Sequence, residues 1–90
     1  MRNRIPEFLK KFEDMYGKTL KVTPIKRDNP EFTPGVYKFR VTIADNPFFE
    51  SIGFPMTRRG RDLISELVYR VFEREACFNA DGSVFYFFEE

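Results

Sequence analysis

The stretch VYKFRVTIA, residues 36–44, decides the fold. Its side chains alternate between apolar and polar, which is the pattern of a β-strand with one buried and one solvated face. The apolar face holds Tyr37, Phe39, Val41 and Ile43. The polar face holds Lys38, Arg40 and Thr42. An apolar sheet face has to be covered by another layer, and the flanking sequence predicts two helices that can cover it.

The first of these helices is predicted over residues 5–16, with Pro6 at its first turn and Gly17 just after its end. Its apolar stripe consists of Phe8, Leu9, Phe12, Met15 and Tyr16. The second helix is predicted to start between Thr57 and Arg61, with Thr57 as a possible N-cap, and to run to about Arg74. Its stripe consists of Leu63, Ile64, Leu67, Val68, Val71 and Phe72.

Three further strands are expected around this frame. Residues 20–23 alternate, and Pro24 predicts that this strand is short, bulged or at a sheet edge. Residues 48–54 are predicted to form the next strand, and residues 84–88 a last one after a turn at Asp81-Gly82. The order is α-β-β-β-α followed by a final β element. The prediction is therefore one α+β domain over residues 1–90, with two helices on one face of a small antiparallel sheet.

The composition fits a small domain of the cytoplasm. The chain has 90 residues, with twelve Phe and four Tyr to build its core, and a net charge of only +1. No apolar run approaches the ~18 residues of a membrane span, and residues 1–15 lack the apolar stretch of a signal peptide. The single cysteine, Cys77, is expected to be structural and reduced. We therefore expect a cytoplasmic location and no membrane partner.

Catalysis is not expected from these residues. The chain contains no histidine, so the most common general base and metal ligand is absent. Ser51, Ser65 and Ser83 lie in no nucleophile motif, and Gly53 and Gly60 form no phosphate-binding loop. The expectation is a protein that is not an enzyme and that uses no metal, cofactor or small-molecule substrate.

Two groups of basic residues are candidate anion-binding sites. Arg58, Arg59 and Arg61 fall in the first turn of the second helix, where exposed N–H groups also attract anions, and Gly60 would let a phosphate approach the backbone. The alternative is an ordinary solvated surface. The second group, Lys21, Lys38 and Arg40, belongs to the polar face of the sheet, which shows no obvious aromatic side chain for stacking bases.

The C-terminal run Phe85, Tyr86, Phe87 and Phe88 is apolar on both faces of its strand. One interpretation is a partner or homodimer interface, because contiguous exposed aromatic side chains usually mark contacts. The other is internal packing, with Phe85 and Phe87 facing the helices and Tyr86 and Phe88 facing the opposite way.

The stretches IPEFLKKFEDMYGK, VYKFRVTIA and TRRGRD together resemble the double-stranded-RNA-binding domain in element order over residues 5–74. The resemblance implies a sheet covered by two helices, and duplex RNA held by basic residues at the start of the second helix. The loop that carries a histidine in that family reads NPEFTPG here. The aromatic tail has no counterpart in the family.

The leading hypothesis is therefore a nucleic-acid-binding module that contacts duplex RNA through Arg58, Arg59 and Arg61. The alternative is a small protein-interaction module, such as a phage or mobile-element regulator or inhibitor. It would bind an acidic protein surface through the same arginines and the aromatic C-terminal strand. Loss of RNA affinity in arginine variants would favour the first hypothesis.

Overall fold

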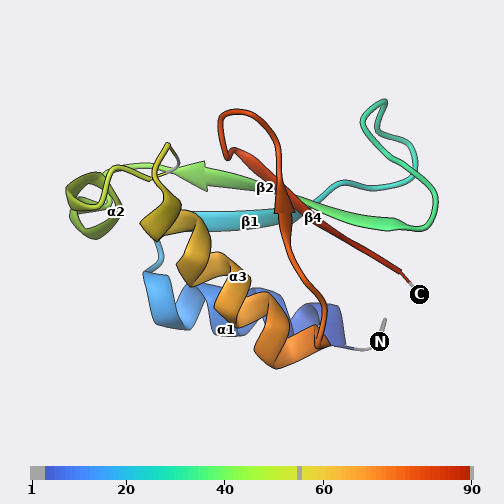
Figure 1. Ribbon diagram of the computed structural model, residues 1–90, viewed down its shortest axis with the longest axis horizontal. Helices are drawn as coiled ribbons and strands as arrows, with labels where there is room; N and C mark the ends of the chain where they lie inside the picture. Colours follow the sequence, from blue (N-terminus) through green and yellow to red (C-terminus); the bar gives the residue numbers. More distant parts are fainter. Residues whose placement is uncertain (1–3, 55, 90) are drawn as a thin grey trace.

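The protein has two layers, with two helices packed against one face of an antiparallel sheet (Figure 1). The computed structural model describes residues 4–54 and 56–89. The elements follow in the order α1 (Ile5–Tyr16), β1 (Leu20–Pro24), β2 (Val36–Ile43), α2 (Pro47–Ser51), α3 (Arg58–Phe72), β3 (Cys77–Phe78) and β4 (Val84–Phe88). This confirms the predicted α+β class, and α1 and α3 are the two helices of the covering layer. Neither these helices nor α2 is long and apolar enough to cross a membrane, within the described ranges.

The sheet has the strand order β1-β2-β4-β3, and every neighbouring pair is antiparallel. β1 lies at one edge, as Pro24 predicts, because a proline cannot donate a ladder hydrogen bond. The last strand, β4, lies between β2 and the two-residue strand β3. In this register Lys38 of β2 lies opposite Tyr86 of β4, and Cys77 of β3 lies on the other side of Tyr86.

The prediction of a strand over residues 48–54 is wrong. The chain forms the short helix α2 at Pro47–Ser51 and then turns. The Asn46 side chain caps this helix by accepting a hydrogen bond from the Phe49 N–H at 3.4 Å, and Pro47 occupies its first turn. Local capping outweighs the strand preference of the aromatic residues. The strand beside β2 is therefore β4, which follows α3 in the sequence.

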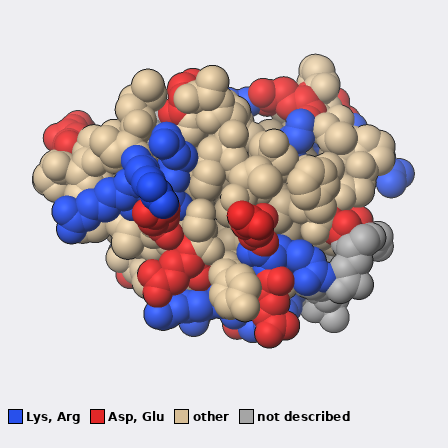
Figure 2. All heavy atoms as spheres, viewed as in Figure 1, with Lys and Arg blue, Asp and Glu red and all other residues tan. Residues whose placement is uncertain are grey.

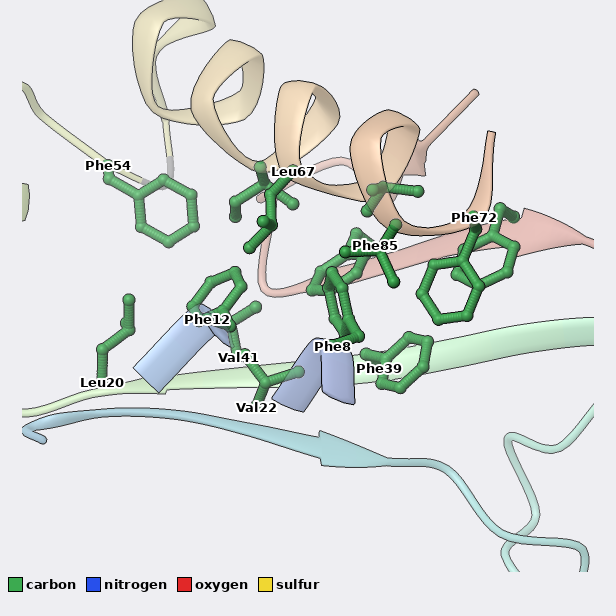
Figure 3. Close-up of a cluster of buried hydrophobic side chains, with 14 of the residues drawn as sticks. Phe8, Phe12, Leu20, Val22, Phe39, Val41, Phe54, Leu67, Phe72 and Phe85 are labelled. Carbon is green, nitrogen blue, oxygen red and sulfur yellow. The ribbon is translucent and has the colours of Figure 1, made fainter. Parts of the chain in front are cut away.

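Phenylalanine rings fill the space between the layers (Figure 3). Seven of the twelve are fully buried, namely Phe8, Phe12, Phe39, Phe49, Phe72, Phe85 and Phe87. The centroids of the Phe39 and Phe85 rings are 5.2 Å apart, and those of Phe72 and Phe87 are 4.5 Å apart. These contacts join β2 to β4, and β4 to α3. Each buried ring removes roughly 150–250 Å² from water, which gives a short chain an adequate core.

The aromatic C-terminal run is divided between the two faces of the sheet. Phe85 and Phe87 are both 0% exposed, so the expectation that they contact a partner is corrected, since no partner can reach them. Phe88 is 59% exposed and Tyr86 is half-buried. The interpretation with Phe85 and Phe87 facing the helices is confirmed.

Candidate nucleic-acid interface

The face of the sheet that points away from α1 and α3 carries both basic and aromatic side chains. Strand residues alternate between faces, so the residues next to the buried Phe39 and Phe85 point outward. The register places Lys38 opposite Tyr86, and Val36 opposite Phe88. Lys21 of β1 is opposite Thr42 and belongs to the same face. We call this surface, formed by Lys21, Lys38, Arg40, Tyr86 and Phe88, the open sheet face.

Tyr86 and Phe88 lie close together on this face. Their ring centroids are 6.0 Å apart and their planes are nearly perpendicular, at 85°. An aromatic side chain for stacking was not expected on this face, because the sequence does not show that residues 84–88 lie beside β2. Alternation along the strand could have predicted this placement. If Phe85 and Phe87 face the helices, Tyr86 and Phe88 must face outward.

Glu31, from the loop between β1 and β2, contacts both cations of β2. The Lys38 Nζ donates to the Glu31 carbonyl oxygen at 3.0 Å, and the Arg40 guanidinium donates to the Glu31 carboxylate. The hydrogen bond from Arg40 lowers the pKa of Glu31, so the Glu31 carboxylate is charged at neutral pH. The side chains of Arg40 and Glu31 are 43% and 48% exposed, so an external anion can still reach the pair. Lys21 is exposed at the edge strand.

The arginine cluster lies elsewhere, at the start of α3. Arg58 and Arg59 are exposed and Arg61 is half-buried. The Arg58 Nε is 3.8 Å from the Asp62 Oδ2, and both side chains are well solvated, so this pair adds little stability. The Thr57 hydroxyl donates to the Ile52 carbonyl oxygen at 2.5 Å and does not cap α3, although Thr57 occupies the N-cap position. The first turn also contains no acidic residue.

Gly60 has a packing role at the start of α3. It is buried, and a Cβ atom added to it would lie 2.3 Å from the Phe54 Cδ2. The missing side chain makes room for the Phe54 ring beneath the first turn of α3. The expectation that Gly60 lets a phosphate approach the backbone is therefore corrected, because this side of the helix faces the core.

The structure does not bring the two basic groups together. Figure 2 shows basic side chains gathered over the start of α3, with acidic side chains beside them. Lys21, Lys38 and Arg40 lie on the opposite side of the sheet from the helix layer. One ligand on the open sheet face therefore has the aromatic pair and the β2 cations within reach, without the arginines of α3.

The remaining candidate groups are engaged in local structure. The Ser51 Oγ donates to the Phe48 carbonyl oxygen at 2.7 Å, and the Ser83 Oγ donates to the Asp81 Oδ1 at 2.6 Å. Cys77 is a half-buried free thiol on β3. Within residues 4–54 and 56–89, no group of three or more His, Cys, Asp or Glu side chains could hold a metal ion.

No family model matches this chain, and the searches of curated proteins and of solved structures found no match either. The fold and the site themselves define the class of protein. It is a small α+β protein whose antiparallel sheet is covered by helices on one face and carries cations beside aromatic rings on the other.

Proposed function

We propose that this protein binds single-stranded nucleic acid, most simply RNA, on the open sheet face. The observation that supports this most directly is the register of β2 and β4, which places Lys38 opposite Tyr86 and next to the exposed Phe88. Aromatic rings stack on bases of any sequence, and cations attract the phosphates that link those bases. A single strand exposes both groups at once, whereas the bases of a duplex are already stacked.

The spacing of the side chains fits this ligand. Neighbouring strands are about 4.8 Å apart, so a base stacked on Tyr86 has its phosphate within reach of the flexible Lys38 side chain. Phe88 lies two residues further along β4 and offers a second ring to the next base. The net charge of +1 and the contacts of Glu31 with Lys38 and Arg40 predict modest affinity that falls steeply with salt.

The experiment is a fluorescence-anisotropy titration of a labelled ten-nucleotide uridine RNA at about 50 mM salt. Phe88→Ala should weaken binding roughly 5- to 150-fold, because a base–aromatic stack is worth about 1–3 kcal/mol. Tyr69→Ala is the matched control, since Tyr69 is 64% exposed but lies on α3. No binding by the wild type, or equal losses in both variants, would contradict the proposal.

Duplex RNA held by the arginine cluster is the alternative ligand within the same class. It is supported by the exposure of Arg58 and Arg59 and by the absence of an acidic residue in the first turn of α3. A double variant, Arg58→Ala with Arg59→Ala, separates the two sites. Preference for a duplex, lost in this variant and kept in Phe88→Ala, would place the binding site on α3.

A second candidate function is protein binding at the corner between α2 and α3. Phe48 and Met56 are 46% and 66% exposed there, close in the sequence to Arg58 and Arg59. Exposed apolar side chains beside arginines suit a partner surface with apolar and acidic residues. Phe48→Ser should abolish such binding and leave RNA affinity unchanged, as a pull-down and an anisotropy titration of the same variant would measure.

A further inference from the structure

A cleft lies at the start of β2, between the loop that joins β1 to β2 and the start of α1. Its volume is about 480 Å³, within the range of ordinary small-molecule sites. Most of its wall is apolar and comes from four separate segments of the chain. The apolar side chains include Ile5, Ile25, Phe32, Pro34, Val36 and Phe39.

Backbone hydrogen bonds hold the walls of this cleft in place. The Ile25 N–H donates to the Lys38 carbonyl oxygen at 2.8 Å, and the Val36 N–H donates to the Thr33 carbonyl oxygen at 3.2 Å. The Glu89 N–H donates to the Gly35 carbonyl oxygen at 2.9 Å, which ties the loop to the end of β4. The cleft is therefore formed before any ligand arrives.

The charges around the cleft favour an anion. Among the described residues, Lys26, Arg27 and Lys38 line it together with the Glu89 carboxylate. The Glu89 Oε1 accepts a hydrogen bond from the Tyr37 hydroxyl at 3.2 Å, so the Glu89 carboxylate already has one hydrogen-bond donor. A ligand that matches this lining has a flat or apolar body and a negatively charged group at one side.

The cleft adjoins the end of the proposed binding surface. Ile5, Tyr37 and Phe39 place its floor on the side of β2 that faces the helices, while Val36 and Glu89 line it at the end of the sheet, next to Phe88. Val36 lies directly opposite Phe88, so a strand that stacks on Tyr86 and Phe88 leads toward the cleft.

We infer that the cleft takes one nucleotide of the bound strand, with its base against Phe32 and its phosphate among Lys26, Arg27 and Lys38. This rests on the proposed function, because it assigns a specific subsite to the same ligand. The half-buried Phe32 ring is the one phenylalanine among the described residues that belongs to the loop between β1 and β2. The base is therefore held in a built pocket as well as on the flat sheet.

The first test is an NMR titration of the protein with adenosine or uridine monophosphate. Saturable shifts are expected at the amides of Ile25, Phe32 and Val36, and Phe32→Ala should weaken binding at least about fivefold. Tyr69→Ala is the control, because Tyr69 is an exposed aromatic residue on α3. A second variant, Lys26→Gln with Arg27→Gln, tests the phosphate contacts without removing an apolar side chain.

The outcomes separate this inference from the proposed function. Shifts produced equally by inorganic phosphate, or no shifts at all, would overturn the cleft as a nucleotide site. RNA binding that is lost in Phe88→Ala but unchanged in Phe32→Ala would also overturn it and would leave the open sheet face as the binding surface. Cleft shifts with mononucleotides, but no RNA binding, would show a mononucleotide site and would overturn both the proposed function and the assignment of the cleft to a bound strand.

Discussion

Gly60 shows how one residue serves packing where the sequence suggests binding. Alanine is the better helix former by about 1 kcal/mol, so propensity alone predicts that Gly60→Ala stabilises α3. The new Cβ would lie 2.3 Å from the Phe54 ring, however, and Phe54 is itself buried. We expect a net loss of about 1–3 kcal/mol in the free energy of unfolding, as in other overpacked cores, measured by urea denaturation.

A double-mutant cycle isolates this contact. Phe54→Ala removes the Cγ and Cδ2 atoms that the new methyl group would meet, so Gly60→Ala should cost less in that background than in the wild type. If Gly60→Ala alone leaves stability equal or higher, the contact with Phe54 is not what requires glycine at this position.

Glu31 competes with an external anion for the cations of β2. Glu31→Gln removes the negative charge that the Arg40 guanidinium contacts, so RNA binding should tighten about two- to tenfold. The dependence of log K on log salt should steepen by about 0.7, the value for one more phosphate contact on a single strand. Anisotropy titrations at several salt concentrations measure both effects.

Glu66→Gln is the control for this prediction. It changes the net charge equally and breaks a comparable exposed pair, with the Arg70 Nη2 2.7 Å from the Glu66 Oε1 on α3. Equal tightening in both variants would show that overall charge, and not the release of Arg40, sets the affinity.

At the scale of elements, Asn46 explains why residues 47–51 form a helix. Its side chain is 6% exposed, accepts a hydrogen bond from the Phe49 N–H and donates one to the Tyr16 carbonyl oxygen at 2.8 Å. It therefore caps α2 and also ties it to the end of α1. Strand propensity is a weak preference, and a capped helix start with proline in its first turn outweighs it.

Asn46→Ala should lower the free energy of unfolding by about 1–2 kcal/mol, because both the cap and the bond to Tyr16 are lost. Asn46→Ser keeps an N-cap acceptor but is too short to replace the contact with Tyr16, so its loss should be intermediate. Thermal and urea unfolding measure the order of the three proteins. A serine variant as unstable as the alanine variant would assign the whole effect to the bond with Tyr16.

Tyr16 links α1 to α3 in a way that depends on pH. Its hydroxyl donates to the Leu63 carbonyl oxygen at 3.0 Å, and burial, followed by the nearby Glu66 charge, raises its pKa. The folded protein therefore favours the protonated hydroxyl. The resulting stability is fully present below the unfolded value near pH 10 and is lost as the pH rises through the higher folded value.

Tyr16→Phe should cost about 0.5–1.5 kcal/mol at pH 7. Above pH 10 the difference between the wild type and the variant should shrink, because only the wild type loses the Tyr16 contribution. Urea denaturation from pH 7 to 11 measures this difference. A difference that stays constant over the whole range would contradict the role assigned to the buried hydroxyl.

For the whole molecule, β4 joins the core to the proposed binding surface. Phe85→Ala should cost about 3–5 kcal/mol, a large part of the stability of a domain this small, because its ring packs against Phe39 and Phe8 in the core. Phe88→Ala should change stability by only about 0.5 kcal/mol, because Phe88 is mostly exposed. Thermal unfolding followed by circular dichroism compares the two, and equal losses would mean that Phe88 also belongs to the core.

Several elements were predictable because their signals are local. The helical period of residues 5–16 and the alternation of residues 36–44 predicted α1 and β2 almost to their ends. The predicted α3 starts in the right place and ends within two residues of Phe72, where Glu73 takes a left-handed conformation. The polar direction of Lys38 and Arg40 also followed from alternation alone.

The sequence by itself determined the two amphipathic helices, the faces of β2, and a core made of phenylalanine, because each of these depends on neighbours a few residues apart. Only the tertiary structure decided that β4 pairs with β2, which places Tyr86 and Phe88 beside Lys38 and leaves the arginines of α3 on another side. The pairing of β2 with β4 joins residues that are more than forty positions apart, as Lys38 and Tyr86 are. Which strand pairs with β2 depends on how all the apolar faces are buried together, and no local sequence pattern predicts this.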